Sequence, residues 1–101
     1  MSGKTYYVYI VSNRLVTTLY IGITNDLLSR VYQHKTGMNK GFSKRYNLKY
    51  LLYFEETDDV ATAISREKKL KRWRNKWKIE LIQKQNSKLE DLAKDWYDDI
   101  A

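Results

Sequence analysis

Residues 6–23 read YYVYIVSNRLVTTLYIGI, two runs of aromatic and β-branched residues around a polar break. Such runs are typical of strands, so we expect one strand over Tyr6–Val11 and another over Thr18–Ile23. The short break between them favours an antiparallel hairpin. A later run, Lys49–Glu55, predicts a third strand.

Alternation along the hairpin predicts a surface that could carry chemistry. Successive side chains of a strand point to opposite faces, so Val8 and Ile10 share one face and Tyr9 lies on the other. If the aliphatic residues of the two strands align, Tyr9, Tyr20 and the space left by Gly22 share a surface. A tyrosine hydroxyl can orient or deprotonate water when a cation lowers its pKa from about 10.

Helical periodicity and capping signals account for the remaining segments. The predicted helices run over Asp26–Lys35, from Val60 to about Trp73 and over Asn75–Gln85, with a last short helix opening at Ser87-x-x-Glu90. The candidate N-caps are Thr24 or Asn25 for the first helix and Thr57 or Asp58 for the second, and Gly37 ends the first. This order predicts an α+β fold, a small three-stranded antiparallel sheet flanked by helices. We expect one domain over residues 1–101, with a helical C-terminal extension from about residue 75.

The composition excludes several classes of site. The chain has no Cys, so it has no disulfide, no thiolate metal site and no Cys nucleophile. No apolar run approaches the roughly 18 residues that a membrane span needs, and the N-terminus shows no secretory signal. We therefore expect a cytoplasmic protein without a membrane partner.

Positive charge is abundant and unevenly distributed. The net charge is +7, which favours polyanions, either nucleic acid or an anionic membrane surface, although a basic protein without such a partner is an equal alternative on charge alone. Leu27–Phe54 contains no Asp or Glu, whereas Arg66–Lys78 holds eight Lys or Arg and one acid, Glu67. This segregation suggests a basic face suited to phosphate.

Glu67 is the most informative single position. Along a helix at about 100° per residue, Glu67 falls near the centre of an apolar stripe made by Val60, Ala63, Ile64 and Leu70. A carboxylate there needs a basic partner, which is the commoner case, or a metal ion. A single carboxylate with water around it is a common way to hold Mg²⁺ beside phosphates.

Other residue types have both structural and chemical interpretations. Arg30 and His34 stand four apart on the first helix and could clamp a phosphate, although a surface Arg and a locally bonded His are commoner. Trp73, Trp77 and Trp96 follow helical spacings, which favours packing in the core over base stacking. Most of the nine Tyr should also serve packing.

Taken in order, the motif residues resemble the GIY-YIG nuclease superfamily. The likeness rests on Tyr7-Val8-Tyr9, Tyr20-Ile21-Gly22, Arg30, His34 and Glu67. It covers about residues 5–86 and is greatest to the short single-domain bacterial branch of uncharacterised endonucleases. The superfamily includes the incision subunit of nucleotide excision repair, so DNA repair is one expected setting. Tyr7 and Val8 stand where the first motif has Gly and Ile, a departure that this branch tolerates at the Gly position.

The resemblance implies a metal-dependent endonuclease. It implies one divalent metal ion, Mg²⁺ or Mn²⁺, held by Glu67, with Arg30 at the scissile phosphate. Tyr9 would deprotonate the attacking water, Tyr20 would position it, and His34 would contact phosphate or assist the tyrosine. Asn75 and Asn86 both remain candidates for an asparagine that the family often adds after the glutamate.

The expected partner is nucleic acid, with DNA favoured over RNA. The side chains expected to bind its backbone are Lys35, Lys40, Lys44, Arg45, Lys71, Arg72 and Arg74. A non-catalytic nucleic-acid-binding module with the same fold is the main alternative, and a basic adaptor for an acidic protein is a second. The intact set of Tyr9, Tyr20, Arg30 and Glu67 favours the enzyme, because binding alone needs no Glu in a basic helix.

Overall fold

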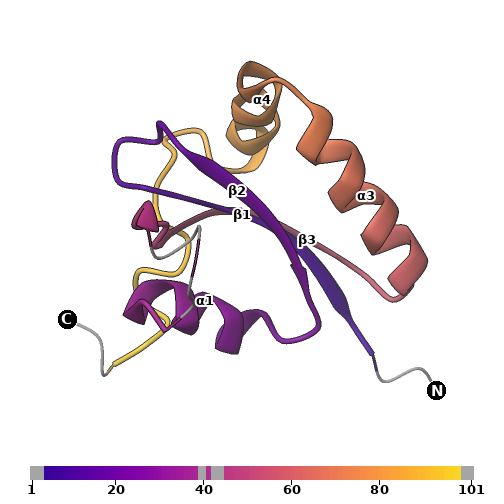
Figure 1. The fold of residues 1–101 in the computed structure, drawn as a ribbon, viewed down its shortest axis with the longest axis horizontal. Helices are drawn as coiled ribbons and strands as arrows, with labels where there is room; N and C mark the ends of the chain where they lie inside the picture. Colours follow the sequence, from indigo (N-terminus) through magenta and orange to yellow (C-terminus); the bar gives the residue numbers. More distant parts are fainter. Residues whose placement is uncertain (1–3, 39–40, 42–44, 99–101) are drawn as a thin grey trace.

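The central sheet has the expected antiparallel plan. The computed structural model describes residues 4–38, 41 and 45–98. Within these residues, β1 (Tyr6–Ser12), β2 (Leu19–Thr24) and β3 (Tyr50–Thr57) form one sheet in the order β2-β1-β3. Because β1 is central, β2 and β3 are the edge strands (Figure 1). The α+β prediction is confirmed.

The register of the hairpin sets the positions of the motif residues. Tyr9 lies opposite Gly22, and Val11 lies opposite Tyr20. Residues that face each other in an antiparallel pair point to the same side of the sheet. The predicted common surface of Tyr9, Gly22 and Tyr20 is therefore present.

Helices cover both faces of the sheet. On one face, Val8, Ile10 and Leu52 pack with residues of α3 (Val60–Arg72) and α4 (Asn75–Gln85). On the other face, Tyr9 and Val11 pack with residues of α1 (Leu27–Thr36) and of the C-terminal segment 86–98. Figure 1 shows α1 on one side of the sheet and α3 and α4 on the other. None of the helices in the described part of the chain is both long and apolar enough to cross a membrane.

Aspartates, rather than the residues expected, cap two of the helices. The Asp26 carboxylate accepts a hydrogen bond from the Ser29 N–H at 3.1 Å and caps α1. Asp59 caps α3 by accepting from the Thr62 N–H at 3.0 Å. The predicted caps were wrong because the nearby threonine hydroxyl is used one step earlier: Thr24 Oγ1 accepts from the Asp26 N–H at 3.0 Å. Gly37 does end α1, in the left-handed conformation with φ of 73°.

The predicted last helix was wrong, because Asn86 organises a turn in its place. The Asn86 amide donates to the carbonyls of Leu52 at 3.0 Å and Glu90 at 2.7 Å. Its oxygen accepts from the Glu90 N–H at 3.0 Å. Leu89 then takes a left-handed φ of 55°, which a right-handed helix cannot contain. The helical part of the extension is α4 alone among the described residues.

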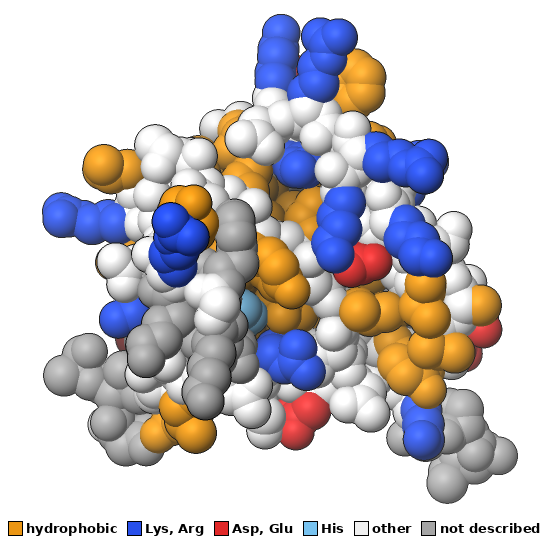
Figure 2. Space-filling view, in the orientation of Figure 1, with side chains coloured by type: hydrophobic (Ala, Val, Ile, Leu, Met, Phe, Trp, Pro, Cys, Tyr) orange, Lys and Arg blue, Asp and Glu red, His pale blue; other side chains and the backbone are white. Residues whose placement is uncertain are grey.

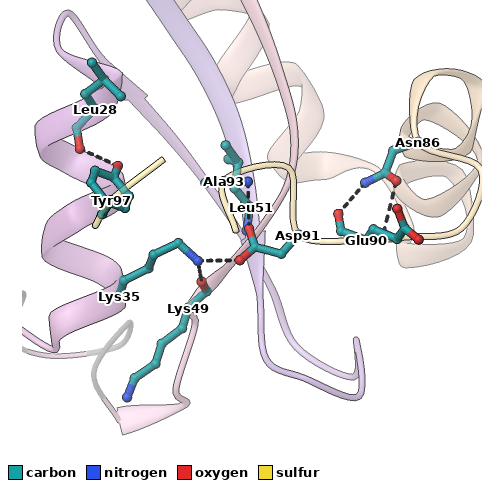
Figure 3. A network of polar contacts seen from close by, with 9 residues as sticks. All are labelled: Leu28, Lys35, Lys49, Leu51, Asn86, Glu90, Asp91, Ala93 and Tyr97. Atoms are coloured by element: carbon teal, nitrogen blue, oxygen red, sulfur yellow. Dashed lines mark hydrogen bonds and ion pairs between the residues drawn. The ribbon is translucent and has the colours of Figure 1, made fainter. Parts of the chain in front are cut away.

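Asp91 holds the C-terminal segment against β3 and α1 (Figure 3). One of its carboxylate oxygens accepts from the backbone N–H groups of Leu51 and Ala93, each at 3.0 Å. The other pairs with the Lys35 ammonium, which also donates to the Lys49 carbonyl at 3.0 Å. Further along, the Tyr97 hydroxyl donates to the Leu28 carbonyl at 2.7 Å. These contacts close the α1 face of the sheet.

Candidate active site

The Tyr9 side chain leaves β1 and meets His34 on α1. Tyr9 is 0% exposed, and its hydroxyl oxygen lies 3.1 Å from His34 Nε2. The two rings meet edge to face, with their centroids 5.6 Å apart. The sheet and α1 thus hold a hydroxyl and an imidazole in hydrogen-bonding contact.

Gly22 makes room for the Tyr9 ring. A Cβ atom at Gly22 would lie 2.4 Å from both the Cζ and the Oη atom of Tyr9. Carbon atoms do not approach so closely, so any other residue would push the tyrosine aside. The glycine is therefore required by the path of the Tyr9 side chain towards the edge strand β2.

Burial fixes the protonation of this pair. It raises the pKa of Tyr9 to about 12, against the opposing effect of the positive charge of Arg30 and a hydrogen bond from it. Burial also lowers the pKa of His34 to about 4, and the charge of Arg30 lowers it further. At neutral pH the hydroxyl is protonated and the imidazole is neutral.

The contacts of Tyr9 indicate the direction of its hydrogen bond. Its oxygen accepts from Arg30, which leaves the single hydroxyl proton to be donated. A buried hydroxyl proton without an acceptor is costly, and the His34 Nε2 atom stands within reach. We therefore assign Tyr9 as the donor and His34 Nε2 as the acceptor, with the imidazole proton on Nδ1.

Glu67 lies beside the buried stripe of α3 and not at its centre. Ala63 and Leu70 are fully buried as expected, but Val60 is 44% exposed and Ile64 is 41% exposed. The stripe is narrower than predicted because the helix contacts the sheet only along the line of Ala63 and Leu70. The Glu67 side chain is 14% exposed, so solvent and a ligand can reach its carboxylate.

Glu67 forms an ion pair with Lys71, one helical turn later. The Lys71 ammonium lies 2.7 Å from a Glu67 carboxylate oxygen and 6.0 Å from the centre of the Tyr20 ring. Its hydrogen bond to Glu67 raises the pKa of Lys71. The i,i+4 spacing could have revealed this pair, but the sequence prediction placed Lys71 among the residues that bind the nucleic-acid backbone.

The five predicted catalytic residues gather at the edge strand β2. The Tyr20 ring lies 6.0 Å from that of His34, and the charge of Glu67 contributes to the raised pKa of Tyr9. Arg30 and His34 come from the helix on one face of the sheet, and Glu67 comes from the helix on the other. In the described part of the chain no further strand lies beside β2, so side chains from the two faces of the sheet can meet at this edge.

A metal ion at this site would need ligands from outside the protein. Over residues 4–38, 41 and 45–98, no three or more His, Cys, Asp or Glu side chains are grouped for metal binding. Glu67 would therefore act as the protein ligand, with water and phosphate oxygens completing the octahedron that Mg²⁺ prefers. The Lys71 ammonium lies against this carboxylate, so a metal ion bound there would have to displace it.

The two candidate asparagines differ in availability. Both hydrogen-bonding ends of the Asn86 amide are used within the fold, by Leu52 and Glu90. Asn75 is the exposed first residue of α4.

The predicted backbone-binding residues have varied surroundings. Lys35 is 12% exposed and paired with Asp91, so its charge serves the fold. Arg45, Arg72 and Arg74 are exposed, whereas Lys40 and Lys44 lie outside the described residues. Figure 2 shows Lys and Arg side chains in blue, spread around hydrophobic surface on one face of the molecule.

Comparison with known proteins agrees with the geometry. The family model described as the GIY-YIG catalytic domain matches residues 5–80. A UPF0213 protein of Pediococcus pentosaceus is 33% identical over 75 residues, which cover 74% of this chain and 79% of the relative. A UPF0213 protein of Clostridium perfringens is 32% identical over 89 residues, which cover 88% of this chain and 95% of the relative.

A solved structure shares the fold. The solution NMR structure of a UPF0213 protein from Bacillus halodurans matches with a TM-score of 0.55 at 21% identity. The match covers 86% of this chain and 92% of that one. With the family model spanning most of the sequence and the motif residues meeting at one edge of the sheet, the chain belongs to the GIY-YIG family.

Proposed function

We propose that this protein is a metal-dependent endonuclease that hydrolyses phosphodiester bonds in nucleic acid, with DNA as its substrate. The observation that carries the proposal is the Tyr9–His34 hydrogen bond, with Arg30 and Glu67 around it. A buried hydroxyl bonded to a neutral imidazole forms a two-step path for a proton. Membership of a family defined by a catalytic domain supports the same conclusion.

In this mechanism, Tyr9 and His34 relay a proton away from the attacking water. The water oxygen bonds to phosphorus as the opposite P–O bond breaks. The water proton passes to Tyr9 Oη while the hydroxyl proton of Tyr9 passes to His34 Nε2, so Tyr9 never carries the full negative charge that its raised pKa disfavours. The low pKa of His34 then favours release of the proton to solvent, and a solvent water protonates the departing oxygen.

Arg30 and Glu67 provide the electrostatic part of the mechanism. The Arg30 guanidinium, which hydrogen-bonds Tyr9, stabilises the charge that develops on the phosphate. Tyr20 positions the attacking water beside the Tyr9 hydroxyl. A divalent metal ion, Mg²⁺ or Mn²⁺, when bound at Glu67, would polarise the phosphate and the leaving oxygen.

Exposed cations supply affinity for the backbone. Arg45, Arg72 and Arg74 are free to meet phosphates in any sequence, and Lys40 and Lys44 remain candidates for the same role. The absence of Cys from the chain suits a cytoplasmic site of action.

Cleavage assays with purified protein test the proposal. Supercoiled, branched and single-stranded DNA, and RNA, are incubated with Mg²⁺ or Mn²⁺. We expect wild-type protein to cleave DNA and Glu67→Ala to bind it without cleavage. Glu56→Ala, which removes an exposed carboxylate on β3, is the matched control and should cleave normally. Cleavage that survives Glu67→Ala would refute the assigned role of Glu67.

The ion pair between Lys71 and Glu67 supports one alternative, a non-catalytic binding module. The pair satisfies the carboxylate without a metal ion. That alternative predicts salt-sensitive binding, unchanged in Glu67→Ala, and no cleavage of any substrate. An adaptor for an acidic protein would instead bind no nucleic acid at modest salt.

A further inference from the structure

Trp77 is exposed on the surface of α4, although its helical spacing predicted packing in the core. It is 49% exposed, whereas Ile82 on the same helix is fully buried. The apolar residues of α4, which also include Ile79 and Leu81, spread too far around the helix for one buried stripe. The sheet covers the side of Ile82 and leaves Trp77 to solvent.

A hollow lies between Trp77 and Trp73. The two rings stand nearly perpendicular, at 85°, with centroids 6.2 Å apart. The hollow has a volume of about 360 Å³ and is lined by Trp73, Trp77, Glu80, Leu81 and Lys84. Its size and its aromatic walls are typical of pockets that bind a small planar ligand.

The surroundings of the hollow carry mostly positive charge. The Arg74 guanidinium lies 5.8 Å from the centre of the Trp77 ring, and that of Arg66 lies 5.6 Å from the Trp73 ring. Arg66 is paired with Glu55 at 2.9 Å, but Arg74 and Lys84 are exposed at the surface. Glu80 is the one acid among the described residues that line the hollow. Aromatic surface bordered by cations suits a ring that is attached to phosphates.

We propose that this hollow binds an unpaired base of single-stranded nucleic acid, which stacks on Trp77 while Arg74 and Lys84 contact the flanking phosphates. In a duplex the bases are stacked inside and cannot enter. The inference rests on the proposed function and specifies its substrate class, a nucleic acid with unpaired nucleotides.

The hollow adjoins the end of the helix that carries Glu67. Glu67 and Lys71 lie on α3, and Trp73 directly follows the last residue of that helix. At about 1.5 Å of rise per residue, the end of α3 is roughly 8 Å along the axis from Glu67. A single strand of several nucleotides that stacks a base on Trp77 could therefore extend along α3 towards Glu67.

Binding without metal isolates the stacking from the chemistry. Labelled single strands of thymidine, abasic strands of the same length and a duplex are titrated in EDTA, with fluorescence anisotropy as the readout. We expect the wild type to bind the thymidine strand most tightly. Trp77→Ala should weaken that binding on the order of tenfold and leave abasic binding unchanged. Trp77→Phe, which keeps an aromatic face, should retain most of the affinity.

Two controls address folding and general surface effects. Ile64→Ala removes another exposed apolar side chain from the α3–α4 side and should bind as the wild type does. Quenching of tryptophan fluorescence by the thymidine strand, but not by the abasic strand, should be largely lost in Trp77→Phe, a variant that keeps the ring packing. Equal binding of thymidine and abasic strands by the wild type would overturn the proposal. Dimerisation that Trp77→Ala abolishes would also overturn it, by assigning the hollow to a second copy of the chain.

The two proposals can fail separately. If the protein cleaves nothing but prefers the thymidine strand through Trp77, the endonuclease proposal fails and the base-binding hollow stands. If it cleaves DNA and Trp77→Ala alters neither cleavage nor the preference for unpaired bases, the hollow is refuted and the endonuclease stands.

Discussion

At the scale of single residues, the environment of Tyr9 and His34 determines their chemistry more than their identity does. Both side chains are buried, and Arg30 adds a positive charge nearby. The same residues on an open surface would titrate near their ordinary values and would not form a defined donor and acceptor. The sequence could supply the candidates, but their pKa values depend on burial by residues distant in the chain.

The low pKa of His34 should make stability depend on pH. Its pKa is about 4 in the folded protein and 6.5 when exposed, so the unfolded chain binds more protons between these values. The free energy of unfolding should therefore fall as pH drops from 6.5 to 4, by about 3 kcal/mol from this group. Urea denaturation at several pH values measures the effect.

His34→Gln is the control for this dependence, because it keeps a hydrogen-bond acceptor but does not titrate. Its free energy of unfolding should change less over the same range. Equal slopes for the two proteins would show that His34 is not buried in its neutral form. Tyr9 affects stability only at alkaline pH. Because its pKa is raised in the folded protein, the free energy of unfolding should fall as pH rises from 10 towards 12.

Gly22→Ala should be destabilising because of one neighbour, Tyr9. The added Cβ would meet the ring at 2.4 Å, and such overpacking costs about 1–3 kcal/mol. The cost should largely disappear when Tyr9 is also changed to Ala. A double-mutant cycle by urea denaturation measures the coupling. Additive losses in the double variant would contradict the close contact.

At the scale of helices and strands, local sequence patterns predicted the main elements well. The β-branched runs predicted all three strands to within two residues at either end, and α4 matches its predicted range. These elements agree because local propensity and burial favour the same structure. The N-caps were displaced by one or two residues at both Asp26 and Asp59, where a threonine hydroxyl competes for the same turn.

Longer-range contacts overrode local patterns at two places. The capping-box pattern at Ser87 did not open a helix because the Asn86 side chain bonds to the Leu52 carbonyl on β3. Trp77 is exposed because only one side of α4, that of Ile82, packs against the sheet. Neither contact is visible in a single stretch of sequence.

Asp91 should contribute strongly to the stability of the C-terminal segment. Asp91→Ala would leave the Leu51 and Ala93 N–H groups and the Lys35 ammonium without their partner. Loss of these hydrogen bonds and of the partly buried ion pair should lower the free energy of unfolding by about 3 kcal/mol. Asp91→Asn keeps an acceptor for the two N–H groups and should cost less.

Urea denaturation compares these variants with Asp95→Ala, which removes an exposed carboxylate from the same segment. Asp95→Ala should be close to neutral. A loss below about 1 kcal/mol in Asp91→Ala would show that the segment is held by other contacts.

At the scale of the whole molecule, the excess of positive charge should control affinity for nucleic acid. The net charge is +7, and the exposed arginines can displace counterions from phosphates. Binding should weaken steeply as salt rises. Arg72→Ala should reduce the slope of log affinity against log salt by about 1, whatever the sequence of the DNA.

Lys88→Ala, in the exposed turn after α4, is the matched control for loss of charge and should leave the slope nearly unchanged. Anisotropy titrations from low to moderate salt measure both slopes. An equal reduction in both variants would mean that net charge, and not a defined face, determines binding.

The meeting of two helices at the edge strand β2 has a consequence for protein synthesis. Tyr9, Tyr20, Arg30 and His34 leave the ribosome early, but Glu67 follows only after all three strands. A nascent chain that has folded its hairpin and α1 therefore still lacks the carboxylate on the opposite face. On the proposed mechanism, an unfinished chain cannot cut the nucleic acids around it, and the order of residues delays the activity until the sheet is complete.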